Sequence, residues 1–167
     1  MKTLPLLALL PMVLAHAAQG ADVVRYKMPN SDFPIAQAVE IPAGQSLVFL
    51  SGAGPEVVDA TAAKDSPAAY GDTKAQTLGT LKKIDASLKS MNLGMKDIVK
   101  MQVFLVGDPA HDGNIDFSGM MESYKLFFGT ADQPNLPARS TVKVAGLANP
   151  GWLVEIEVTA VRGAAKH

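Results

Sequence analysis

The chain has 167 residues, of which 48% are hydrophobic and 19% are charged, and it contains no cysteine. Length and composition are typical of one globular domain. The 15 basic and 16 acidic residues leave a net charge of -1, with no basic run outside the Lys82-Lys83 pair. This balance argues against a general binder of nucleic acid or anionic membranes. The lack of cysteine excludes disulfides, thiolate metal sites and cysteine nucleophiles.

A secretory signal peptide is predicted at the N-terminus. Lys2 precedes an apolar run from Thr3 to Leu14, and Ala15-His16-Ala17 gives a small-x-small cleavage site. The apolar run is too short to span a membrane. We therefore expect residues 1–17 to be removed, with cleavage as late as residue 21, and the mature protein to be exported to the periplasm or secreted. We expect no membrane attachment after removal.

Histidine offers little chemistry to the mature chain. Of the three histidines, His16 leaves with the signal peptide and His167 is the last residue. His111 lies in a Gly/Asp/Pro-rich stretch and is interpreted as a solvated loop residue. A histidine metal site or a Ser-His-Asp triad is therefore hard to build.

The first half of the domain is predicted to begin with strands. A short strand is expected at 23–27 and a longer one at 33–41. The turn at 42–45 makes 46–52 the hairpin partner of the strand at 33–41. The near-continuous apolar run in 46–52 predicts a strand that is buried on both faces.

Two helices follow, separated by a strand. The first is predicted from Asp72 or Thr73 to Asn92 or Gly94, because apolar residues recur at helical spacing between them. A strand is expected at 97–106. The second helix is predicted at about 115–128 and ends at Gly129. Its apolar set is Phe117, Met120, Met121, Tyr124, Phe127 and Phe128.

Two alternating segments close the domain, at 137–144 and 152–161. The first begins with Arg139, directly after Pro137-Ala138. A guanidinium at a strand start forms either an exposed ion pair or a bidentate clamp for a carboxylate. Residues 22–163 are thus assigned to a single domain, and 164–167 to a disordered tail.

The order strand, strand, helix, strand, helix, strand, strand predicts an α+β sandwich in which two helices cover one face of a mixed sheet. The other face would carry apolar positions that no helix remains to cover. Because a small monomer rarely exposes such a surface, we expect an oligomer.

The ordered set of motifs resembles the Rid family, the reactive intermediate deaminases, also called YjgF-like proteins. The resemblance covers about residues 33–162. It implies a chorismate-mutase-like fold and a homotrimer with ligand clefts between subunits. The matching segments are Leu50-Ser51-Gly52, Gln76-Thr77, Gly94 to Lys100, Tyr124 to Phe128, Pro137 to Ser140 and Val154 to Glu157.

The resemblance implies hydrolysis of small 2-imino or enamine acids to 2-oxo acids and ammonia, without a metal or an organic cofactor. Arg139 would hold the substrate carboxylate and Glu155 would position or activate the water. Backbone at Ser51, Gly52 and Thr141 would line the cleft. Read from the residues alone, Glu155 is equally an ordinary outward carboxylate on the same strand face as Glu157.

Three positions of the expected binding cleft depart from the pattern of the family. Ile35 stands where family deaminases carry a tyrosine, Met121 where they carry an asparagine, and Thr141 where they often carry a cysteine. A cleft with Arg139 and a more apolar wall favours a bulkier or more apolar carboxylate ligand, or binding without turnover.

Three functions therefore remain open. They are an exported imine deaminase, a non-catalytic trimer that binds a small carboxylate, and a structural or protein-interaction trimer. Retention of Arg139 and Glu155 favours the first two. Ribonuclease activity, attributed to some relatives, finds little support in a slightly acidic chain that lacks a histidine pair.

Overall fold

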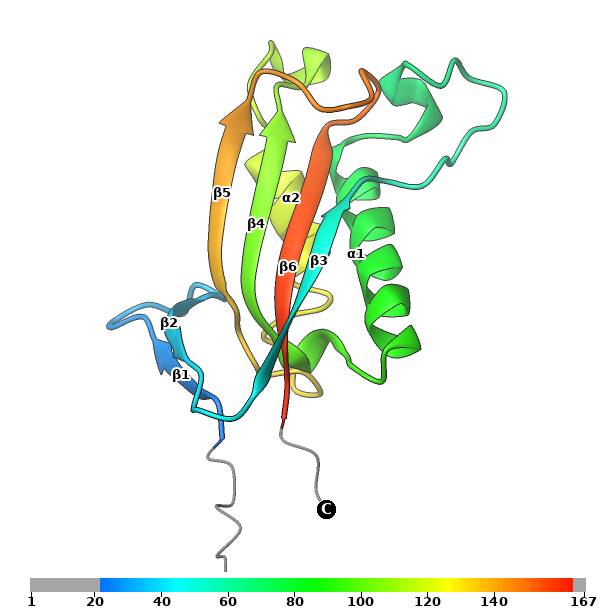
Figure 1. The fold of residues 1–167 in the computed structure, drawn as a ribbon. Helices are drawn as coiled ribbons and strands as arrows, with labels where there is room; N and C mark the ends of the chain where they lie inside the picture. The colour runs from blue at the N-terminus through cyan, green and yellow to red at the C-terminus, as the bar shows by residue number, and fades with distance from the viewer. Residues whose placement is uncertain (1–21, 164–167) are drawn as a thin grey trace, which may run out of the picture.

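The computed structural model describes residues 22–163, so the predicted signal peptide and C-terminal tail lie outside the described residues. The centre of the fold is a six-stranded mixed sheet in the order β1-β2-β5-β4-β6-β3 (Figure 1). The strands are β1 (Val24–Lys27), β2 (Ala36–Glu40), β3 (Ser46–Ala53), β4 (Ile98–Val106), β5 (Ala138–Val144) and β6 (Val154–Arg162).

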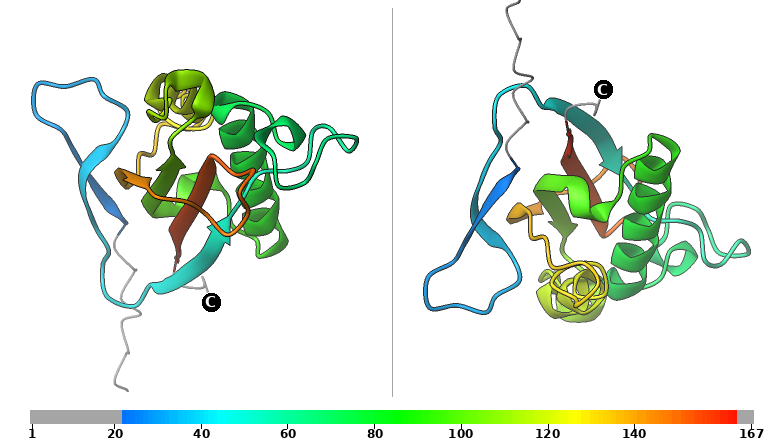
Figure 2. Two further views of the ribbon diagram at one scale, coloured as in Figure 1. Left: turned by 90° about the horizontal axis from the view of Figure 1, so that it is seen from above. Right: turned by 90° about the horizontal axis from the view of Figure 1, so that it is seen from below.

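Two α-helices, α1 (Thr73–Ser90) and α2 (Phe117–Tyr124), lie side by side against one face of this sheet (Figure 2). Three short 3-10 turns occupy the connections, at Pro67–Ala69, Met95–Asp97 and Pro109–His111. The predicted α+β class and the placement of both helices on one face are confirmed.

Helix α1 forms where its sequence predicts it. The Asp72 carboxylate accepts a hydrogen bond of 2.8 Å from the Ala75 amide and so caps the first turn. Leu81, Ile84 and Leu88 are buried against the sheet, as their spacing requires. The helix ends at Ser90, before the predicted stop signals at Asn92 and Gly94.

Helix α2 is shorter than the predicted span of 115–128. The Asp116 carboxylate accepts a hydrogen bond of 2.8 Å from the Gly119 amide, which fixes the start at Phe117. After Tyr124 the chain tightens, because the Leu126 amide donates to the carbonyl three residues back rather than four. The last part of the predicted helix is therefore a turn.

The predicted hairpin between 33–41 and 46–52 is wrong. Strand β2 pairs antiparallel with β1, and β3 pairs antiparallel with β6 at the other edge of the sheet. The turn after β2, the second strand of the sheet, carries the chain to β3 at the far edge instead of folding it back (Figure 1). A local turn signal cannot decide which strand becomes the partner.

The prediction that the strand at 46–52 is buried on both faces is also wrong for the single chain. Strand β3 is an edge strand, and its side chains Leu47 and Phe49 are 46% and 74% exposed. An edge strand with exposed large apolar side chains is a surface that natural proteins normally cover.

The two faces of the sheet differ, as its alternation dictates. Met101, Val103 and Leu105 of β4 are buried beneath the helices. Lys100, Gln102 and Phe104 point the other way, where no helix of the described chain covers them. Lys100 and Gln102 are exposed there. None of the helices within residues 22–163 is both long and apolar enough to cross a bilayer.

Candidate functional site

Arg139 is the second residue of β5 and projects from the helix-covered face of the sheet. In the parallel pairing of β4 with β5 it lies opposite Met101, which is fully buried. The chain is fixed just before it, because the Pro137 carbonyl accepts a hydrogen bond of 3.0 Å from the Ala36 amide. This contact joins β2 to the start of β5.

Three aromatic rings surround the Arg139 guanidinium. Its central carbon lies 4.3 Å from the ring centre of Tyr124, 5.5 Å from that of Phe33 and 5.9 Å from that of Phe117. These distances are typical of cation–π contacts. Its Nη1 also donates to the Met121 sulfur at 3.1 Å. We call these four residues around Arg139 the aromatic enclosure.

The Arg139 charge is poorly solvated and has no acidic partner within residues 22–163. Burial lowers the pKa of the Arg139 guanidinium, and burial raises the pKa of the Tyr124 phenol. That hydroxyl donates to the Pro34 carbonyl at 2.8 Å. A partly buried cation without an anion is well suited to bind an anionic ligand.

The three positions that depart from the family pattern lie in different surroundings. Met121 is 6% exposed and touches Arg139 directly through its sulfur. Thr141 lies two residues along β5 on the same face as Arg139, and its buried hydroxyl oxygen has no hydrogen-bond partner within residues 22–163. Ile35 is half-buried and packs against the core.

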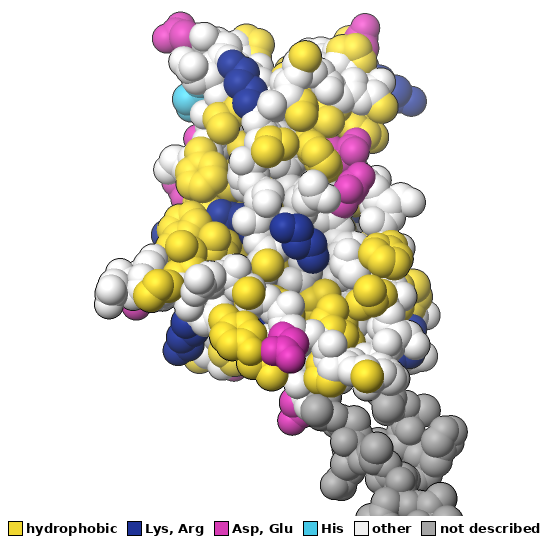
Figure 3. Space-filling model, turned by 60° about the vertical axis from the view of Figure 1, so that its left-hand side comes forward, with side chains coloured by type: hydrophobic (Ala, Val, Ile, Leu, Met, Phe, Trp, Pro, Cys, Tyr) yellow, Lys and Arg dark blue, Asp and Glu magenta, His cyan; other side chains and the backbone are white. Residues whose placement is uncertain are grey.

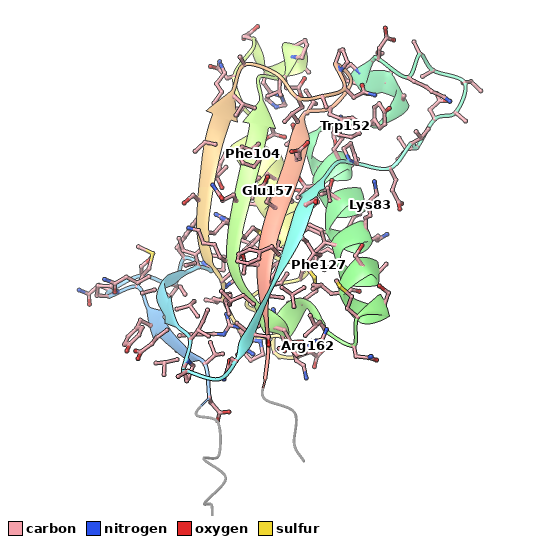
Figure 4. All side chains as sticks on the ribbon, in the orientation of Figure 1. Lys83, Phe104, Phe127, Trp152, Glu157 and Arg162 are labelled. Carbon is pink, nitrogen blue, oxygen red and sulfur yellow. The ribbon has the colours of Figure 1, made fainter. Side chains whose placement is uncertain are left out.

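Glu155 lies on the uncovered face of the sheet, next to the bulge in β3. Its carboxylate lies so close over Gly52 that a methyl group on Gly52 would collide with it. The adjacent Ser51 lines a hollow of about 360 Å³ together with Glu157, Lys100 and Gln102. Figure 4 labels Glu157 and Phe104, two other side chains of this face.

Arg139 and Glu155 therefore lie on opposite faces of the sheet in one chain. On β4, Met101 pairs with Arg139 and Phe104 pairs with Glu155. Residues three apart on a strand point to opposite faces. The single chain thus brings Arg139 together with Met121 and Thr141, and Glu155 together with Ser51 and Gly52, but it does not bring the two groups together.

The rings of the aromatic enclosure were not predicted as site residues. Phe117 and Tyr124 are seven residues apart, which places them on one face of α2, and this spacing alone could have indicated a shared role. Phe33 belongs to the segment before β2 and carries no such signal. His111 is half-exposed, and its Nδ1 lies 3.2 Å from Asp108, in agreement with a loop histidine.

No three potential metal ligands gather anywhere between residues 22 and 163. The two sets of polar groups around Arg139 and Glu155 supply a cation and a carboxylate.

This architecture is that of a known class of small α+β proteins. The family model described as Endoribonuclease L-PSP matches residues 28–162, and the chain belongs to this family. It is 38% identical over 136 residues to a RutC family protein of Haemophilus influenzae, which covers 81% of this chain and 92% of that protein.

Two further relatives confirm the resemblance to the Rid proteins. The chain is 35% identical over 134 residues to the 2-iminobutanoate/2-iminopropanoate deaminase of Salmonella typhimurium, covering 80% of this chain and 91% of that one. The crystal structure of Escherichia coli TdcF with bound serine aligns with a TM-score of 0.55 and 33% identity, over 83% of this chain and 94% of TdcF.

Proposed function

We propose that this protein hydrolyses 2-imino or enamine acids to 2-oxo acids and ammonia, in a cleft built from two copies of the chain. Arg139 of one copy holds the substrate carboxylate, and Glu155 of a neighbouring copy positions the water. Glu155 guides the water to the imine carbon and accepts its proton as the C–O bond forms. This proton passes to the imine nitrogen and gives a carbinolamine. Glu155 then takes the proton of the new hydroxyl and passes it to the same nitrogen as the C=O bond forms, so the C–N bond breaks and ammonia leaves.

The observation that carries this proposal is the unpaired charge of Arg139. A guanidinium that is desolvated among rings and lacks an acid within residues 22–163 has a free donor fork for a carboxylate. An imine is already electrophilic. The protein therefore needs only to hold the carboxylate of the substrate, orient a water and transfer protons from that water to the nitrogen. The name of the Salmonella relative and the serine bound to TdcF support the same chemistry.

The need for a second copy follows from the sheet. Since Arg139 and Glu155 lie on opposite faces of one chain, a single chain cannot apply both groups to one substrate. The uncovered face and the exposed edge strand β3, with Phe49 74% exposed, provide the surface for a neighbour. We propose a homotrimer, in which a cyclic arrangement repeats the same cleft at each interface.

A complementation experiment tests both parts of the proposal. Arg139→Gln and Glu155→Gln are prepared separately and co-expressed with two different tags, and mixed assemblies are purified through both tags. Imino acids are generated in place by an amino-acid oxidase, and ammonia and 2-oxo acid are measured. We expect each variant to be inactive alone and the mixed assembly to recover activity in about a third of its sites, because each doubly tagged ring of three contains one interface that joins an intact Arg139 to an intact Glu155.

Absence of deamination by the wild-type protein would contradict the proposed reaction. An active wild type with mixed assemblies that stay inactive would contradict the two-copy site alone. Lys143→Gln serves as the matched control, because Lys143 is another cation on the same face of β5 whose only described hydrogen bond is to the Gly113 carbonyl.

A second function, binding of a small carboxylate without turnover, is favoured by the contact between Arg139 and Met121. A thioether is a weak acceptor, and it occupies the place where a polar side chain would help to orient water. The double variant Ile35→Tyr with Met121→Asn distinguishes the two functions. A gain in ammonia release supports a deaminase with a modified wall, and carboxylate binding without release by either protein supports the binding function.

A further inference from the structure

The outer rings of the aromatic enclosure are unusually exposed. Phe33 and Phe117 are each 39% exposed, and their rings lie nearly parallel, with centres 6.4 Å apart and planes at 11°. Both lie within 6 Å of the guanidinium carbon of Arg139. Two half-exposed phenylalanine rings beside an unpaired cation form an apolar surface next to a charged one.

The inner side of the enclosure is already filled. Tyr124 is 1% exposed, its ring lies closest to the guanidinium, and it stacks on Phe128 at 4.7 Å. Met121, also buried, occupies Nη1. A carboxylate therefore reaches Arg139 from the solvent side, where Phe33 and Phe117 are exposed, and its substituent meets these two rings.

Phe33 connects the surroundings of Arg139 to a hollow that neither Arg139 nor Phe117 lines. Phe33 lines this hollow of about 440 Å³ together with Pro34, Phe128, Asp32 and Lys125. That volume is within the range of small-molecule sites, which are mainly apolar with a few polar groups. Figure 3 brings forward the side of the sheet that carries β1, β2 and β5, where hydrophobic side chains are interspersed with separate Lys and Arg side chains.

We propose that the Arg139 cleft selects carboxylates with an aromatic or large aliphatic side chain, and that Phe33 and Phe117 determine this specificity. The inference rests on the proposed function in one respect only, namely that Arg139 binds a carboxylate. A substrate of this class covers both exposed rings, whereas one of alanine size leaves them in water. The preferred imines are then those derived from amino acids such as phenylalanine and leucine.

Calorimetric titration with unreactive carboxylates tests the selection without any need for turnover. The probes are propanoate, 4-methylpentanoate and 3-phenylpropanoate, which share one carboxylate and differ only in apolar bulk. We expect 3-phenylpropanoate to bind at least about tenfold more tightly than propanoate, with 4-methylpentanoate between them. Equal or tighter binding of propanoate would overturn the inference.

Two single variants then assign the selection to the rings. Phe33→Ala and Phe117→Ala should each reduce the ratio of the two dissociation constants by roughly three- to tenfold, the range of one aromatic contact. The dissociation constant of propanoate should change less than that of 3-phenylpropanoate in both variants, because Arg139 is intact and propanoate covers little of either ring. Leu126→Ala is the control, since Leu126 is 64% exposed and lies close by in sequence but outside the enclosure. An unchanged ratio in both phenylalanine variants would overturn the assignment.

The two proposals fail separately. If the three carboxylates bind with the expected order of affinity but no imine releases ammonia, the deaminase function is contradicted and the selection is supported. Ammonia release that is as fast from the alanine-derived imine as from the phenylalanine-derived one contradicts the selection and supports the deaminase function.

Discussion

Two half-buried arginines of this fold have different hydrogen-bond partners. Arg25, on β1, donates to three backbone carbonyls, at 2.9 Å to Ile98, 2.6 Å to Leu136 and 3.0 Å to Lys96. Among the described residues Arg139 donates to the Met121 sulfur, interacts with the Tyr124 phenol and otherwise faces rings. Burial lowers the pKa of both.

The difference separates an arginine that holds the structure from one that is available to a ligand. The carbonyls around Arg25 compensate its desolvation, so its charge binds β1 to the segments before β4 and β5. Within residues 22–163 the desolvation of Arg139 is offset by the Tyr124 phenol and the Met121 sulfur, but by no backbone carbonyl and no carboxylate. The free-energy cost of this desolvation remains in the folded chain and is offset when an anion binds to Arg139.

The largest expected effect follows removal of the Arg139 charge. In Arg139→Gln the dissociation constant for 3-phenylpropanoate should rise about 100-fold or more, because a bidentate charged contact is lost. The free energy of unfolding should change by less than about 1 kcal/mol, because no backbone carbonyl and no carboxylate loses a partner and the Tyr124 hydroxyl keeps its bond to the Pro34 carbonyl. Titration calorimetry and urea unfolding measure the two quantities. A large loss of stability would place Arg139 in the same class as Arg25.

Removal of the Arg25 charge should have the reverse profile. Arg25→Gln should lower the free energy of unfolding by about 3 kcal/mol, because three charged hydrogen bonds are lost and partly buried carbonyls stay unpaired. Urea unfolding at one fixed protein concentration measures the change. Lys27→Gln, an exposed cation on the same strand, is the control and should stay within about 0.5 kcal/mol of wild type.

The smallest effect is expected at Tyr124. Tyr124→Phe keeps the ring against the guanidinium but removes the hydroxyl that donates to the Pro34 carbonyl. The free energy of unfolding should fall by about 1 kcal/mol, and carboxylate affinity should change less than about threefold. If affinity falls as far as in Arg139→Gln, the hydroxyl rather than the ring face prepares the cation for its ligand.

Features that short stretches determine could be predicted from the sequence. Helix α1 has its cap at Asp72 and its apolar stripe within 18 residues, so its place and buried face were correct. Arg139 could be singled out because it stands at the start of an alternating segment. The strand that pairs with β3 could not, because the choice between β2 and β6 depends on the packing of the whole sheet.

The environment of the site was also beyond local reasoning. Met121 lies 18 residues before Arg139, and the two meet only because α2 packs over β5. That Glu155 lies on the opposite face from Arg139 depends on the registers of two separate pairings with β4. The carbonyl partners of Arg25 lie more than 70 residues away, and no pattern near β1 indicates them.

Strands β1 and β2 and the segment between them form an arm. The way this arm is attached has a consequence for the exchange of its backbone amides with deuterated solvent. The arm meets the rest of the sheet at one backbone pair, Ala36 with Ala138, and through the hydrogen bonds of Arg25. Its amides should therefore exchange sooner than those of β4, which is paired on both sides. Each opening carries Phe33 away from Arg139. The measured affinity for a ligand that contacts Phe33 is therefore the affinity of the closed form reduced by the fraction of molecules in which the arm is closed. A ligand that contacts Phe33 then slows deuterium uptake in the arm and leaves β4 unchanged.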